Sequence, residues 1–575
     1  MVTSRVLGAT LLASGLSYAA RDASIAGDVR PSLDVAKSRG PQIFNAVHDS
    51  MRQWGASLHH NGMSFFLATV PEGVILHHGN NNEKSPDYPD WLAYEVEHAE
   101  HFARGGRGPP GGGKGPGRGG PPGPPGPPAL GSMEYGMGQL PLVDDHASMD
   151  STSFEPDEDP PEQQKGGWLH TYRTTRPLRY LYVDGMGGGK TTMGTLDSQD
   201  YLLRGTRTIR AFDDRQTKDD DKSTRDGAPQ KRAGGPMDEQ ERAVELCALC
   251  KDWNLSGVIR MEAGFEIIQC DFYDGLEEVQ ALQRPPPESG ERGPGRGSFG
   301  NFEFIRGLSE RYYDIGSSRT TVDYSSMVSA YFFPVNLTNP DPKRPDLPRL
   351  SNTTDAELAA IQKYLNHTIS DRLNDPRRAI DWQDVTDLIV GRYADRIRFM
   401  AEKTSTASEI ASELSFLLTV YLDYSGRDSD QVAAAIERCT TFYLHGVDPV
   451  TEADRLVHAA IKATTSDLCT RLFQVRELVT GDNELDDSER HSRSVSTLKS
   501  LMEHLQWARF KSCGGCAVDE VCLIPMWPSG TKQDYDSPRC VNSTNRDDGE
   551  SYWGGWGPGG GRGGRGGKGG RGPPK

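Results

Sequence analysis

The chain has 575 residues with a net charge of −17, and 35% of its residues are hydrophobic. This length allows two or three domains with sizeable cores, whereas the 65 glycines and 38 prolines gather partly in tracts that cannot bury a core. The acidic body excludes the usual kind of nucleic-acid-binding surface. Beyond the N-terminal segment no apolar run approaches the roughly 18 residues of a membrane span. We therefore expect neither nucleic acid nor a membrane as a partner.

Residues 1–20 have the layout of a secretory signal peptide. Arg5 precedes a modest apolar run over residues 6–16, and small residues lead to a cleavage point after Ala19 or Ala20. We predict a secreted, extracellular protein; a cytosolic chain with a disordered N-terminus is the alternative. Five Asn-x-Ser/Thr sequons agree with export and predict N-glycosylation. The sequons begin at Asn254, Asn336, Asn352, Asn366 and Asn542.

Nine cysteines suit an oxidising compartment and favour disulfide bonds, with one cysteine left over. Two Cys-x-x-Cys pairs, which begin at Cys247 and Cys513, could suggest zinc, but 262 residues separate them, far from the spacing of a zinc ribbon. Cys439 and Cys469 fall on consecutive predicted helices and could be bridged. The sequence predicts disulfides and no metal site.

Residues 21–103 are predicted to be folded, as the first part of an interrupted α+β domain. Apolar residues at helical spacing predict a helix over residues 41–55. Two short apolar runs predict strands over residues 65–70 and 73–79. Residues 91–104 are predicted to be a strand end that runs into a helix.

Two histidines of that helix, in the pattern His98-x-x-His101, share one helical face. Glu95, Glu97 and Glu100 lie beside them in the sequence. A metal site is conceivable there, but so many nearby carboxylates more simply indicate a solvated helix.

Residues 104–166 and 546–575 are predicted to be disordered, because glycine and proline at this density, or acidic polar sequence, cannot bury a core. The glycine- and proline-rich stretch 104–131 carries four basic and no acidic residues, and the tail from Gly554 carries five and none. Behind a signal peptide, we expect this basic Gly/Arg tail to be a tether that binds acidic polysaccharide.

Order is expected to resume at residue 167 and to continue to residue 335, which completes the interrupted domain. An apolar run predicts a strand over residues 178–183, a helix is predicted over 239–253, and residues 256–272 contain two buried strands.

A glycine-rich loop over residues 185–189 follows the first of these strands and ends in Lys190 and Thr191. A strand that leads into such a loop outlines a phosphate-binding loop, in which backbone N–H groups and a lysine surround phosphates. The pattern requires a glycine at Asp184, however, and a carboxylate there would repel phosphate. A strand that ends in a glycine turn is the alternative.

Residues 354–545 are predicted to form a helical domain with a Cys-rich cap. Thr354 and Glu357 have the spacing of a capping box. Asp448-Pro449 is expected to begin a long helix that ends at Gly481. The predicted fold class is therefore α+β, with an interrupted mixed α/β N-terminal half followed by an all-α C-terminal half with a Cys-rich cap.

Three short motifs together resemble the ADP-ribosyltransferase-like fold: a strand that ends in His78-Gly, Trp91 at the start of a strand–helix segment, and Glu266 on a late strand. The resemblance covers about residues 65–272. It implies that His78 would hold a ribose hydroxyl of NAD, that Trp91 would lie beside the nicotinamide, and that Glu266 would be the catalytic carboxylate, which stabilises positive charge on the sugar. The chain as a whole resembles uncharacterised secreted fungal proteins.

The sequence thus predicts a secreted glycoprotein without assigning its activity. An NAD-binding, ADP-ribosyltransferase-like protein is the sharpest enzymatic interpretation, and NAD enters only through that resemblance. A non-enzymatic extracellular surface or adhesion protein is one alternative. A nucleotide-binding protein that uses residues 184–191 as a phosphate loop is another.

Overall fold

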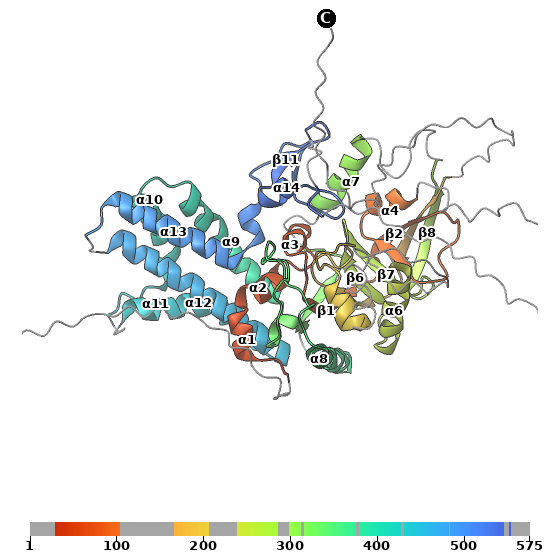
Figure 1. Ribbon diagram of the computed structural model, residues 1–575, viewed down its shortest axis with the longest axis horizontal. Helices are drawn as coiled ribbons and strands as arrows, with labels where there is room; N and C mark the ends of the chain where they lie inside the picture. The colour runs from red at the N-terminus through yellow and green to blue at the C-terminus, as the bar shows by residue number, and fades with distance from the viewer. Residues whose placement is uncertain are drawn as a thin grey trace, which may run out of the picture.

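The computed structural model describes residues 29–103, 166–205, 239–285, 298–311, 316–374, 379–426, 430–481, 484–545 and 551–553. A mixed α/β half with a large sheet lies beside a half made of long helices (Figure 1). The predicted α+β fold class is confirmed. The predicted signal peptide, nearly all of the 104–166 insertion and nearly all of the basic tail lie outside the described residues.

The sheet has nine strands in the order β8-β4-β2-β3-β7-β6-β5-β1-β9. Neighbouring strands are antiparallel except β5 and β6, which are parallel. The central strands β6 and β7 are buried along their whole length, and β5 is buried except at Arg179, which explains their mostly apolar sequence. The strands are β1 (Ser64–Val70), β2 (Ile75–Asn80), β3 (Asp90–Ala93), β4 (Trp168–Thr174), β5 (Leu178–Val183), β6 (Gly257–Met261), β7 (Phe265–Gln269), β8 (Leu276–Gln283) and β9 (Thr321–Ser329).

In the N-terminal half, α4 and α6 lie where helices were predicted, α1 and α7 were not predicted, and one prediction is corrected. The single helix expected over residues 41–55 is wrong, because the chain forms two helices, α2 and α3. The break between them contains Met51, whose φ of 56° is left-handed and interrupts a helix. The helices are α1 (Leu33–Ser38), α2 (Gly40–His48), α3 (Gln53–Leu58), α4 (Val96–Phe102), α6 (Glu239–Asp252) and α7 (Ser298–Glu310).

The C-terminal half is helical, and α1 and α2 pack against its longest helix, α12 (Figure 1). One hydrophobic core therefore runs from the sheet into the helical half. No helix in the described parts of the chain has both the length and the apolarity to cross a membrane. The remaining helices are α8 (Asp355–Asn374), α9 (Trp382–Glu402), α10 (Ala407–Leu418), α11 (Gln431–Thr441), α12 (Glu452–Thr480), α13 (Asp487–Leu505) and α14 (Lys532–Asp536).

The start of α12 differs from the prediction, whereas its end at Gly481 is confirmed. The helix begins after Thr451 and not after Asp448, because Thr451 and Asp454 form a reciprocal capping box. Asp454 also accepts hydrogen bonds from Trp382 Nε1 at 2.9 Å and from Ser325 Oγ at 2.7 Å. These bonds join the cap to α9 and to the sheet.

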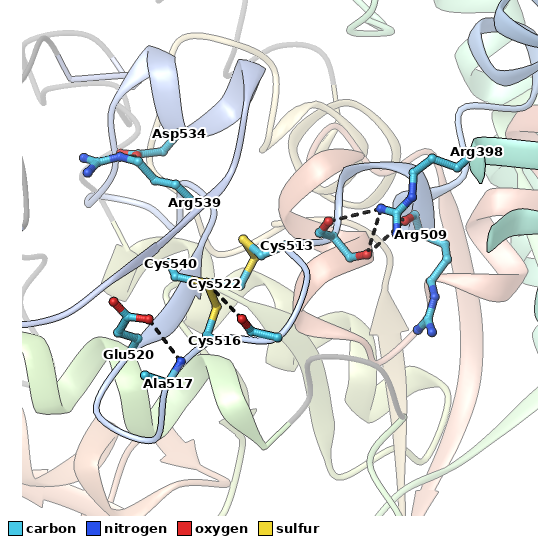
Figure 2. The surroundings of a disulfide bond; sticks show 12 residues. Arg398, Arg509, Cys513, Cys516, Ala517, Glu520, Cys522, Asp534, Arg539 and Cys540 are labelled. Carbon is cyan, nitrogen blue, oxygen red and sulfur yellow. Dashed lines mark hydrogen bonds and ion pairs between the residues drawn. A yellow bond between two sulfur atoms is a disulfide. The ribbon is translucent and has the colours of Figure 1, made fainter. Parts of the chain in front are cut away.

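Both halves contain disulfide bonds, as predicted. Cys439 is bonded to Cys469, and Cys247 is bonded to Cys270. Figure 2 shows the Cys-rich cap, in which Cys513 is bonded to Cys522 and Cys516 to Cys540 beside the short strands β10 (Val521–Leu523) and β11 (Arg539–Val541). The cysteine left over is Cys250, which is buried.

Candidate functional site

Glu266 lies in a fully buried cluster of charged side chains on one face of the sheet. Arg260 Nε donates to Glu266 Oε1 at 2.7 Å, and the same guanidinium also bonds Glu239 of α6. Lys190 Nζ donates to Glu262 Oε2 at 2.5 Å. Carboxylates and cations therefore neutralise one another here, which a buried charge requires.

The electrostatics of this buried cluster differ from one glutamate to another. Burial alone would raise the pKa of Glu239, but the charges of Arg260 and Arg242 lower that pKa to about 2. Burial raises the pKa of Glu262, and Glu266 raises it further. The arginines thus hold Glu239 ionised, while Glu262 takes a proton more readily than an exposed glutamate does.

The glycine-rich loop packs onto this cluster. A Cβ at Gly188 would lie 2.9 Å from Glu266 Oε1, so the backbone approaches as only glycine allows. Lys190 is 3% exposed and sits 5.1 Å from the ring centroid of Trp527. Thr191 Oγ1 shares a hydrogen bond with Thr195 Oγ1 at 2.8 Å. Both residues predicted to bind phosphate are thus engaged inside the protein.

His78 projects from the other face of the sheet. His77 pairs with Ala93, and Ala93 pairs with Glu266, so these three residues share one face. Successive strand residues alternate between faces, which puts His78 on the opposite one. Its Nδ1 lies 2.7 Å from the carbonyl oxygen of Trp91, and burial lowers its pKa to about 3.

Trp91 is on the same face as Glu266, because it lies two residues from Ala93 on β3. Its side chain is 3% exposed and belongs to the main hydrophobic core. The structure thus brings Trp91 and Glu266 to one face and does not bring His78 to that face.

A divalent cation could be held by His98, Glu262 and Glu266, which offer donor atoms within 4.8 Å of one another. Burial lowers the pKa of His98, which keeps its imidazole neutral, as a metal ligand must be. The interpretation of α4 as a solvated helix is wrong, because His98, His101 and Glu95 are buried. The helix packs on the sheet where Gly79 leaves room for the carbonyl of Ala99.

A second site, absent from the sequence predictions, is a cavity of about 950 Å³ that is lined mainly by α2, α3 and the segment of residues 331–348, with Asp184 and Gln506. This volume is at the upper end of the usual range for ligand pockets. Three carboxyl groups, those of Asp49, Asp184 and Asp346, line it. The other residues used below are Arg39, Asn45, Gly55, His59, Asn61 and Asn336.

Asp184 follows β5 directly, at the point where the chain turns through Gly185. The φ of Gly185 is 69°, which favours glycine, and its N–H donates to Asp184 Oδ1 at 2.8 Å. A Cβ at Gly62 would lie 1.9 Å from the carbonyl oxygen of Asp184, so the chain packs closely on both sides. Burial raises the pKa of Asp184 to about 8, and Asp49 adds to the shift. Asp184 therefore carries a proton at neutral pH.

Asp49 lies in the break between α2 and α3. Its Oδ1 is 2.8 Å from Nδ1 of His48, and its Oδ2 is 3.6 Å from Nε2 of His59. A Cβ at Gly55 would lie 2.3 Å from the Cβ of Asp49, so glycine lets α3 approach. The helix break that the sequence did not predict is what positions this carboxyl group.

Three residues that line the cavity carry buried acceptor oxygens without a partner in the described part of the chain. Asn45 Oδ1, Asp49 Oδ2 and Asn61 Oδ1 are buried and have no hydrogen-bond partner among the residues that the structure describes. The guanidinium of Arg39 is bonded to three backbone carbonyls, and Asp346 is bonded to Arg344. Unpaired buried acceptors are costly, so a ligand that fits must bring donors such as hydroxyl groups. An anionic ligand would face carboxyl groups instead.

The predicted glycosylation sites lie at the surface. Four sequon asparagines are exposed: Asn254, Asn336, Asn352 and Asn366. Asn542 is partly buried, and its Nδ2 is 3.3 Å from Asp519 Oδ2. Asn336 also lines the cavity, so a glycan on it would lie at the edge of that site.

Comparison with known proteins identifies fungal relatives. Residues 28–289 match the family model described as the YPL277C N-terminal domain. "Uncharacterized protein YOR389W" of Saccharomyces cerevisiae is 24% identical over 571 residues, covering 86% of this chain and 82% of the relative. "Uncharacterized protein YPL277C" of the same yeast is 25% identical over 445 residues, covering 67% and 80%. No solved structure gives a significant match. The expected likeness to uncharacterised fungal proteins is confirmed, whereas export and the NAD-related role stay predictions.

Proposed function

We propose that this chain is an exported, N-glycosylated hydrolase that cleaves a neutral, hydroxyl-rich substrate of the glycoside class in the cavity of Asp49 and Asp184. One observation carries the proposal: a carboxyl group that burial keeps protonated shares a cavity with a second carboxyl group. Hydrolases of glycosides use such a pair, with one carboxylic acid whose pKa is raised.

In the proposed reaction, Asp184 donates its proton to the glycosidic oxygen as the bond from that oxygen to the anomeric carbon breaks. Asp49 removes a proton from the water that attacks the anomeric carbon. The products are two alcohols, one of them the new reducing end. The proton on Asp49 then returns to Asp184 through solvent, so water is the only co-reactant.

The composition of the cavity supports the substrate class. The unpaired oxygens of Asn45, Asp49 and Asn61 accept hydrogen bonds from hydroxyl groups. The terminal nitrogens of Arg39 already donate to backbone carbonyls and are less available to phosphate or carboxylate, and the carboxyl groups of the cavity would repel such an anion. A neutral glycan therefore fits better than a nucleotide.

The test is an assay of the full chain, recovered from culture medium, on end-labelled neutral, amine-bearing and acidic oligosaccharides. We expect cleavage of a neutral oligosaccharide, and loss of that cleavage in Asp49→Asn. A chain that binds neutral glycans without cleaving them would favour the extracellular surface or adhesion protein. Absence of both binding and cleavage would overturn the proposal.

The NAD-related interpretation has its own test. Glu266 is ion-paired with Arg260 and His78 projects from the opposite face, so the geometry gives this interpretation less support than the cavity gives hydrolysis. NAD hydrolysis by the purified chain, abolished in Glu266→Gln, would restore it. Stabilisation of the chain against unfolding by a nucleoside triphosphate, if it is lost when Lys190 is replaced, would likewise restore the phosphate-loop alternative.

A further inference from the structure

A second, smaller hollow of about 250 Å³ is also lined by Asp49. It is formed where the break between α2 and α3 meets α9 and the short helix η5 (Ala508–Lys511). Asp49 and Gly55 line both this hollow and the large cavity. The proposed base is therefore shared by the two hollows.

Apart from His48 and Asp49, the charged side chains that line the small hollow are paired within it. Arg52 Nη2 is 2.6 Å from Asp387 Oδ2, and Arg509 Nε is 3.3 Å from Asp395 Oδ1. Ion pairs that satisfy one another offer no net charge to a ligand, but they present polar edges to hydroxyl groups. The hollow thus suits the same neutral, hydroxyl-rich chemistry as the large cavity.

We infer that the substrate is an oligomer, whose chain passes Asp49 and places at least one unit in the small hollow while the rest lies in the large cavity. This inference rests on the proposed function of the same site. A substrate with units on both sides of the reacting bond gains binding energy from each side, and cleavage then falls inside the chain and not only at its end.

Gly391 offers a way to fill the hollow without disturbing the fold. It lies on the exposed side of α9 and lines the hollow, and a Cβ built on it meets no atom within 4 Å. Gly391→Trp should occupy the hollow. Gly391→Ala is the matched control, because alanine adds only a methyl group and favours the helix.

The experiment measures kcat/KM for neutral oligosaccharides of increasing length in the wild type and both variants. The wild type and Gly391→Ala should gain about tenfold, equivalent to 1.4 kcal/mol, when the chain becomes long enough to reach the hollow. Gly391→Trp should lose that gain and keep the activity on the shortest substrate. Equal effects of Gly391→Trp on short and long substrates, or no effect on either, would overturn the inference.

Binding of the same oligosaccharides to the Asp184→Asn variant, with and without Gly391→Trp, separates the two proposals. If binding increases with substrate length and loses that increase in Gly391→Trp, while the wild type cleaves nothing, the result would support a binding site that spans both hollows and would contradict the hydrolase proposal. Cleavage whose rate does not depend on substrate length would support the hydrolase proposal and contradict the site that spans both hollows. Absence of both binding and cleavage would contradict both proposals.

Discussion

Replacing Arg260 by methionine is expected to lower the free energy of unfolding by about 3–5 kcal/mol, because it leaves the buried carboxylate of Glu266 without its cation. Arg260 has no exposed surface and is bonded to both Glu239 and Glu266. Methionine fills a similar volume but offers no charge. Urea unfolding of the purified chain, followed with a core probe, gives the change by linear extrapolation.

Arg306→Met is the matched control for that variant. Arg306 forms a comparable ion pair with Glu303 at 2.8 Å, but both side chains are about one-third exposed. We expect this control to change the free energy of unfolding by at most about 1 kcal/mol. If the two variants lost equal stability, the charged cluster would not be the buried, mutually neutralised unit described above.

The Asp184→Asn variant is expected to lower kcat/KM for an unactivated neutral glycoside by about 10²–10⁴-fold, which is the usual contribution of a general acid. Asparagine has the shape of a protonated aspartic acid and keeps the acceptor oxygen that Gly185 N–H bonds at 2.8 Å. The fold should therefore persist. Initial rates with the same oligosaccharide for both proteins give the ratio.

An activated substrate identifies the role of Asp184. A dinitrophenyl glycoside has a leaving group that departs without protonation, so the Asp184→Asn variant should lose much less activity on it than on the oligosaccharide. Asp49→Asn should lose activity on both, because water must still be deprotonated. If Asp184→Asn lost both activities equally, Asp184 would shape the cavity and would not act as an acid.

Local sequence patterns predicted much of the fold. The apolar runs of β1, β2, β5 and the two strands of residues 256–272 stand where predicted, as do α6 and the end of α12 at Gly481. These elements depend on hydrophobic periodicity and on capping residues within a few positions. The start of α12 was wrong because Thr451 outcompetes Asp448 through its reciprocal bond with Asp454, a choice between two plausible local signals.

The cavity could not be predicted in the same way. From the sequence, Asp184 was considered only as a departure from the phosphate-loop pattern, and no role was predicted for Asp49. Their proximity depends on a helix break at Met51, which no proline or glycine marks, and on a sheet order that places β5 between β1 and β6. Local patterns carry little information about which distant segments meet. The one available signal was an aspartate between a buried strand and a glycine turn.

Glu266 and Lys190 also show that local sequence patterns do not reveal which distant residues meet. The sequence offered them to two different functions, a transferase and a phosphate loop. The structure instead brings them into one buried cluster with Arg260 and Glu262, in which both are paired. The residue types and their positions on strands suited a catalytic or binding role. The burial of a charged group and the side chains that pair with it decide which role it can have.

The proton on Asp184 is the central claim, and the pH dependence of stability tests it without a substrate. The unfolded-state pKa is close to 3.8 and the folded-state pKa is raised to about 8, so the folded state retains a proton that the unfolded state releases between these values. Relative to Asp184→Asn, the wild type should lose about 1.4 kcal/mol of unfolding free energy per pH unit from about pH 4 to about pH 8. A difference that stays constant from about pH 5 to about pH 8 would mean that Asp184 is ionised in the folded protein, and would contradict its role as an acid.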